Sequence, residues 1–138
     1  MYISIGELGT ALGKDIVKSG HVRKAWSECQ REGARQRRCD IEFRVRYRAS
    51  IGDFRREVEK ALSRWMTQAR ARELMEKIAA KLSKWHQEIS DLNYPNNAPM
   101  RILGAFVYRG TDDTWRVIDV SLAAYMLFSK AQIDAGAR

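Results

Sequence analysis

The chain has 138 residues, of which 45% are hydrophobic and 30% are charged, and this composition excludes a disordered, fibrous or multidomain protein. No apolar run approaches the roughly 18 residues that span a bilayer, and the N-terminus MYISIGELGT lacks the basic and then apolar order of a signal peptide, so we expect no membrane contact and a cytoplasmic location. The two cysteines, Cys29 and Cys39, are too few for a disulfide framework, and we expect both to be reduced and to act as small hydrophobic residues.

The net charge of +8 is concentrated in the middle of the chain. Residues 23–72 contain fifteen lysines and arginines against seven aspartates and glutamates, whereas the remaining residues contain ten of each. The whole surplus of positive charge therefore lies in one stretch of the sequence. Such a concentration indicates a surface for an anionic partner or one wall of an assembly, and the alternative is a basic surface that meets only solvent.

Two helices are predicted at the N-terminal end. Ser4 can cap a helix over about residues 5–18, in which apolar residues recur at helical spacing, and the glycine of KSGH ends it. The same spacing continues in Val22, Ala25, Trp26 and Cys29, which predicts a second, short helix. The polar and basic segment REGARQRR that follows is predicted to be a loop.

Residues 39–50, CDIEFRVRYRAS, alternate between apolar and charged side chains, which predicts a strand with one buried face. The side chains predicted to face the core are Ile41, Phe43, Val45, Tyr47 and Ala49. The side chains predicted to face outward are Glu42, Arg44, Arg46 and Arg48. Like charges at every second position of a strand are unfavourable unless an anionic group faces them or they protect an exposed surface from wrong pairing.

Residues 52–92 have a helical pattern almost throughout, but their apolar stripe changes face. Residues 54–65 place their apolar side chains on one side, and residues 74–92 place theirs on another. Because TQARAR contains no glycine or proline, we expect one continuous helix of about 60 Å that packs on its own core with one end and on a neighbour with the other. The alternative is a break near residues 67–72.

The C-terminal part predicts a hairpin. NYPNNAP is a loop by composition, and RILGAFVY and WRVIDVSLAAYMLF flank the turn segment RGTDDT. AYMLFSKAQ either extends the second strand or begins a closing helix. We therefore expect a single α+β domain over residues 1–138, with N-terminal helices, a small and mainly antiparallel sheet that ends in a C-terminal hairpin, and a long central helix packed on the sheet.

Motifs for catalysis, metals and cofactors fail on spacing. GELGTALGK has the wrong glycine spacing for a phosphate loop, and neither His21 nor His86 has a cysteine or histidine at ligand distance in the sequence. No GxSxG elbow is present, and Asp112 and Asp113 are expected to form a turn. We therefore expect neither an enzyme nor a cofactor.

Nucleic-acid binding is one interpretation of the basic 23–72 surface. Arginines and aromatic residues interleave in RVRYR, FRR and SRWMTQARAR, and such stretches attract phosphates and unstacked bases. The aromatic side chains of these stretches, however, belong to the predicted core faces.

Assembly is the interpretation that we prefer, because the order of elements is similar to the layout of small phage tail-terminator and tail-completion (neck) proteins, whose subunits close a ring on the end of a tail tube. In that layout IEFRVRYRASIGDFRREVEKAL is the strand that leads into the packing helix, and MRILGAFVYRGTDDTWRVIDVSLAAY completes the sheet. The resemblance implies a homo-oligomeric structural subunit that is cytoplasmic during synthesis and then part of the virion. Its partners would be other structural proteins of the assembly, with DNA as a further contact of the basic face.

Nine residues are candidates for these contacts. The side chains expected to face an anion or a neighbouring subunit are Arg37, Arg38, Arg44, Arg46, Arg48, Arg55 and Arg56. Two tryptophans, Trp85 and Trp115, are expected to contact another subunit.

Overall fold

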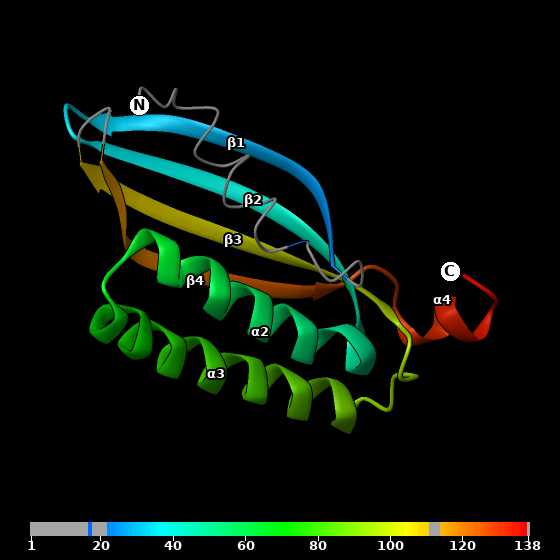
Figure 1. The fold of residues 1–138 in the computed structure, drawn as a ribbon. Helices are drawn as coiled ribbons and strands as arrows, with labels where there is room; N and C mark the ends of the chain where they lie inside the picture. Colours follow the sequence, from blue (N-terminus) through cyan, green and yellow to red (C-terminus); the bar gives the residue numbers. More distant parts are fainter. Residues whose placement is uncertain (1–16, 18–21, 111–113, 138) are drawn as a thin grey trace.

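The computed structural model describes residue 17, residues 22–110 and residues 114–137, with the side chains of residues 48–54, 65 and 68 left out of the description. The described elements follow the chain as β1 (Arg23–Gly33), β2 (Gln36–Arg46), α2 (Tyr47–Trp65), α3 (Gln68–Asp91), β3 (Pro99–Gly110), β4 (Trp115–Met126) and α4 (Lys130–Asp134). The four strands form one antiparallel sheet in the order β1-β2-β3-β4. In the sequence, α2 and α3 come between the two central strands, β2 and β3. In space, the two helices lie on one side of the sheet (Figure 1).

Strand β2 shows the alternation that the sequence predicts over most of its length. Ile41, Phe43 and Val45 are buried, and Arg44 and Arg46 are exposed. The strand begins earlier than predicted, at Gln36, and it ends at Arg46 because Tyr47 begins α2. The Tyr47 N–H donates a hydrogen bond to the Ala98 carbonyl, and its hydroxyl donates one to the His86 carbonyl. These two bonds direct the chain from the sheet into the helical layer.

Strand β1 replaces the short helix predicted over residues 22–29, and that prediction is wrong. Nine positions of β1 pair with β2 in an antiparallel ladder, with irregularities between Lys24 and Trp26 and between Arg31 and Gly33. The first irregularity places Ala25 outside the ladder and interrupts the two-residue period of a strand. The apolar residues of this segment therefore have the spacing that is typical of a helix. A short helix gains little on its own. Pairing with β2, which would otherwise form the edge of the sheet, therefore prevails over the local pattern.

The predicted long central helix is also wrong, because the helical stretch breaks between α2 and α3. Met66 has an extended backbone with φ −156°, and Thr67 caps α3 by accepting a hydrogen bond from the Arg70 N–H with its side chain. The two apolar stripes point in different directions on a straight helix. The break turns α3 back alongside α2, so that both stripes reach the same sheet (Figure 1). The fold is α+β, with a four-stranded antiparallel sheet and three helices in the part of the chain described here, but it lacks the predicted long central helix.

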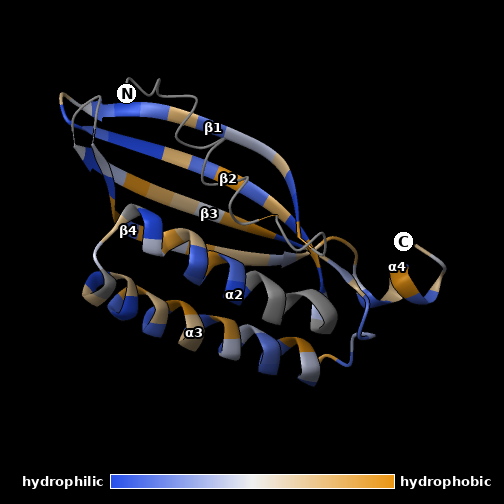
Figure 2. Cartoon of the chain, in the orientation of Figure 1, coloured by the Kyte–Doolittle hydropathy of each residue, from blue (hydrophilic) through white to orange (hydrophobic). Residues whose placement is uncertain are grey.

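The core lies between the helical pair and one face of the sheet. Figure 2 shows bands of hydrophobic and hydrophilic residues alternating along α3, which is the pattern of a helix with one buried face. The helices contribute buried residues such as Val58, Leu62 and Leu74, and β3 contributes Ile102 and Phe106. The predicted helix over residues 5–18 lies, except for residue 17, outside the described residues.

The two cysteines form a disulfide, which corrects the expectation that both are reduced. Cys29 of β1 and Cys39 of β2 lie directly opposite each other in the antiparallel register, with their Cα atoms 4.0 Å apart. The number of cysteines could not show this pairing. It depends on the hairpin register, which the sequence did not predict.

Candidate functional site

The sheet has a second face, which we call the open face because α2 and α3 pack on the other one. Residues that lie opposite each other in an antiparallel sheet point to the same side, so the pairing defines four rows that cross all four strands. The rows are Arg23–Arg44–Arg101–Tyr125, Trp26–Glu42–Leu103–Ala123, Glu28–Asp40–Ala105–Ser121 and Gln30–Arg38–Val107–Asp119. The open face also carries Arg46 beside Pro99 and Arg109 beside Arg116.

Positive charge is in excess among the side chains of this face. The described pairs of the sheet give it seven arginines against four carboxylates. These side chains are Arg23, Arg38, Arg44, Arg46, Arg101, Arg109 and Arg116, against Glu28, Asp40, Glu42 and Asp119. The open face therefore attracts anions.

One row, which we call the arginine row, concentrates this charge. It consists of Arg23, Arg44 and Arg101 on three neighbouring strands, followed by Tyr125 on β4. Like charges directly opposite each other destabilise a sheet. A negative group is therefore required close to the row.

Glu42 supplies part of that negative charge from the next row. Its residue is only 3% exposed, and its carboxylate oxygens lie 3.1 Å from Arg44 Nη2 and 3.5 Å from Arg101 Nη1. A buried carboxylate of this kind is stable only when paired. One carboxylate nevertheless faces two guanidinium groups, and the side chains of Arg44 and Arg101 remain 44% and 42% exposed. The arginine row keeps an uncompensated positive charge toward solvent.

Exposed aromatic rings lie beside the arginine row at both edges of the sheet. Trp26 on β1 is 44% exposed and Tyr125 on β4 is 46% exposed, both uncommon values for such large side chains. The Arg101 guanidinium lies 5.0 Å from the centroid of the Tyr125 ring, which is within the range of a cation–π contact. Aromatic and cationic groups thus share one surface.

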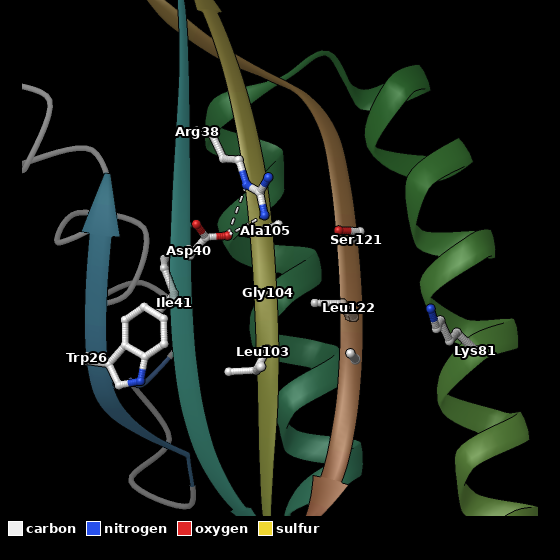
Figure 3. Close-up of a pocket in the computed structure, with 11 residues that line it drawn as sticks. Trp26, Arg38, Asp40, Ile41, Lys81, Leu103, Gly104, Ala105, Ser121 and Leu122 are labelled. Carbon is white, nitrogen blue, oxygen red and sulfur yellow. Dashed lines mark hydrogen bonds and ion pairs between the residues drawn. The ribbon is translucent and has the colours of Figure 1, made fainter. Parts of the chain in front are cut away.

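A shallow hollow of about 440 Å³ lies next to these groups. Trp26 stands at one side of it, and Leu103, Ala105 and Ala123 form an apolar floor. Figure 3 shows the ion pair of Arg38 and Asp40, at 3.1 Å, lying over β3 at one end of the hollow. Lys81 of α3 also lines it, beyond β4 (Figure 3).

The structure separates the arginines that the sequence groups into one basic surface. Arg38, Arg44 and Arg46 lie on the open face. Arg37 points to the other side, is buried, and lies 4.9 Å from the centroid of the Trp115 ring. The helix α2 carries the other three candidates: Arg55 and Arg56 are exposed there, and the side chain of Arg48 is outside the description.

The two candidate tryptophans also differ in position. Trp115 is buried beneath Arg37 at the start of β4. Trp85 of α3 is half-buried, and Lys81 Nζ lies 5.7 Å from its ring centroid. Neither position tests the prediction of a subunit contact.

Sequence reasoning missed half of the open face. It did not single out Arg23 and Trp26, because their segment was predicted to be a helix. It did not single out Arg101 and Tyr125, because β3 and β4 are far from β2 in the sequence. The alternation in RILGAFVY did indicate that Arg101 faces away from the core. The alternate residues Ile102, Gly104 and Phe106 all face the core.

Other kinds of site find less support in the described residues. They contain no group of three or more histidine, cysteine, aspartate or glutamate side chains arranged to hold a metal ion. None of the helices described here is long and apolar enough to cross a membrane. Comparison of the chain with known protein families, with curated proteins and with solved structures finds no match.

Proposed function

We propose that the chain is a non-enzymatic structural subunit of a homo-oligomeric ring or tube, of the kind that phage tails use as a terminator or neck component. The proposal is based on the position of β1 at the edge of the sheet, with β2 as its one described neighbouring strand. Nine of the 11 residues of β1 pair with β2, and no other described element makes substantial contact with it. A long strand edge with unpaired backbone groups is a template for pairing with another chain.

The β1 edge has backbone groups directed away from its own sheet. The Cα separation of 4.0 Å between Cys29 and Cys39 is that of a pair without mutual backbone hydrogen bonds. The N–H and carbonyl of Cys29 therefore point away from β2, and so do those of Ser27, two residues earlier in the same ladder. In the proposed assembly these groups pair with a strand from a second subunit.

Strand β4 forms the opposite edge and is partly protected. Arg70 Nη2 donates a hydrogen bond to the Ile118 carbonyl at 3.1 Å, and the Val120 N–H donates one to Asp119 Oδ1 at 2.9 Å. Both interactions lie at the irregularity of the β3–β4 ladder. The part of β4 beyond it, residues 121–126, pairs with β3 alone among the described strands.

Pairing of β1 with residues 121–126 of the next subunit would join two different edges. Such a head-to-tail contact closes into a ring when the rotation between subunits permits, and otherwise extends into a tube or filament. In this role the protein is cytoplasmic during synthesis and then part of the virion, where it contacts other structural proteins. The open face of each sheet would line one surface of the assembly.

Light scattering coupled to size-exclusion chromatography tests the proposal. We expect the wild-type protein to elute as one discrete species of several times 15.9 kDa, the mass of the chain. Ser27→Pro removes an outward N–H and should yield a folded monomer, because proline is tolerated in edge strands. Ser27→Thr keeps the N–H and should preserve the oligomer. A wild-type protein that stays monomeric at every concentration, or an oligomer that survives Ser27→Pro, would overturn the proposal.

A further inference from the structure

We propose that the open face of the sheet binds single-stranded nucleic acid, with phosphates along the arginine row and bases over Trp26 and Tyr125. Charge is the first argument. Neighbouring strands lie about 4.8 Å apart, so the guanidinium-bearing side chains of Arg23, Arg44 and Arg101 form a line of roughly 10 Å across the sheet. Glu42 neutralises only part of this line. An anion that runs across the strands would remove the remaining repulsion.

The exposed aromatic rings argue for a nucleic acid among the possible anions. Trp26 and Tyr125 lie at opposite edges of the sheet, and Leu103 and Ala123 form an apolar surface in the row beside the arginines. Bases stack on aromatic side chains whatever their sequence, while arginines follow the backbone. A small phosphate compound would use the arginines but would leave the distant second aromatic ring without a role.

The shape of the surface favours a single strand over a duplex. The bases of a duplex are already stacked and paired, and side chains reach them only through the grooves. The two long helices, α2 and α3, lie on the covered face, so neither of them is placed to enter a groove from the open face (Figure 1). An open antiparallel sheet with exposed aromatic rings is instead a surface on which unpaired bases can lie flat.

The same charge distribution argues against a second copy of this face as its partner. Two open faces in contact would bring together the surplus arginines of both subunits. The Asp40 carboxylate, which could pair with an arginine of such a partner, is already paired with Arg38 at 3.1 Å. The open face is therefore distinct in chemistry from the strand edges that the proposed assembly uses.

Fluorescence anisotropy with labelled oligonucleotides tests this proposal. The probes are a 20-nucleotide oligo-dT, an oligo-U of the same length, and a 20-base-pair DNA duplex. We expect both single strands to bind more tightly than the duplex. With three phosphates neutralised, the logarithm of the affinity should fall with the logarithm of the salt concentration with a slope of about −2. A preference between oligo-dT and oligo-U identifies DNA or RNA as the natural ligand class.

Substitutions on the open face separate the two kinds of contact. Trp26→Ala and Tyr125→Ala should each weaken binding about tenfold, the loss expected for one stacked base, and should leave the salt slope unchanged. The double variant Arg44→Ala/Arg101→Ala should reduce the slope by about 1.4. Because it deprives the buried Glu42 of both partners, this variant can lose its fold. Arg23→Ala/Arg46→Ala removes the same charge, leaves Glu42 paired, and should also weaken binding and flatten the slope.

A matched control removes two positive charges from the helical layer. Arg55→Ala/Arg72→Ala changes exposed residues of α2 and α3 and should leave the affinity within about twofold. An equal loss in this control, or no binding by the wild-type protein, would overturn the proposal. So would a polyglutamate peptide of matched charge that binds as tightly as oligo-dT, because the surface would then suit an acidic protein segment. Repeating the titration with Ser27→Pro shows whether binding depends on assembly.

Discussion

The Arg37 guanidinium lies 4.9 Å from the centroid of the Trp115 ring and joins the start of β2 to the start of β4 across the core side of the sheet. The same guanidinium donates hydrogen bonds through Nη1 to the carbonyl oxygens of Gly33 and Gln36, at 3.0 and 3.1 Å. A buried charge requires partners of this kind. Arg37 therefore holds the turn between β1 and β2 against the edge strand β4 at the same end of the sheet, although it lies in the most basic stretch of the sequence.

Arg37→Ala should lower the free energy of unfolding by about 2–3 kcal/mol, because it removes a cation–π contact, two hydrogen bonds and the packing of the aliphatic stem. Arg38→Ala is the neighbouring control. It breaks a half-exposed ion pair with Asp40 and should cost less than about 1 kcal/mol. Urea denaturation followed by circular dichroism measures both. Equal losses in the two variants would contradict the structural role of Arg37.

The sequence predicted the central strand well because its signal is local. Ile41 and Phe43 are buried and Arg44 is exposed, as the two-residue period requires, since β2 is paired on both sides and covered on one face. The edge strand β1 has no such period. An extra residue at Ala25 interrupts its alternation, and its stability depends on a partner that lies later in the chain.

The break between the helices and the arginine row were less accessible to sequence reasoning. TQARAR contains no glycine or proline, and the chain breaks there because both apolar stripes must reach one sheet. Thr67 was the local signal, since threonine is a preferred N-cap. Local alternation could place Arg44 and Arg101 on an outward face, but no local signal shows that they form a row with Arg23, because the register of three strands brings these residues together.

Thr67→Ala tests the cap at this break. Thr67 accepts the Arg70 N–H at 3.3 Å with its hydroxyl, and loss of an N-cap hydrogen bond costs about 1 kcal/mol. We expect the substitution to reduce the free energy of unfolding by about that amount. Thr67→Ser retains an acceptor at the same position and should be close to neutral. If Thr67→Ala were neutral in thermal and urea denaturation, the cap would not contribute to the start of α3.

The disulfide makes a separate prediction about the edge strand. Cys29 and Cys39 are separated by ten residues, and closing a loop of this length stabilises a protein by roughly 3 kcal/mol. Reduction, or the variant Cys29→Ala/Cys39→Ala, should therefore lower stability by about that amount.

The loss should be localised, because β2 is the described element on which β1 depends. Hydrogen exchange should accelerate in β1 before it does so in β3, and mass spectrometry of the unreduced protein should show no free thiol. Two reactive thiols in freshly purified protein, or uniform acceleration over all strands, would contradict this role of the disulfide.

Two glycines provide a matched pair for the packing of the sheet. A Cβ atom on Gly104 would lie 2.6 Å from a ring carbon of Phe106 and 3.3 Å from a side-chain carbon of Leu122. Phe106 is fully buried, so its ring has little room to move, and overpacking of this kind costs about 1–3 kcal/mol. A Cβ atom on Gly33 would meet nothing within 4 Å. We expect Gly104→Ala to destabilise the protein by about 1–3 kcal/mol and Gly33→Ala to be neutral or slightly stabilising. Urea denaturation measures both variants. Equal denaturation midpoints for Gly104→Ala and Gly33→Ala would contradict the close packing of β3 against β4.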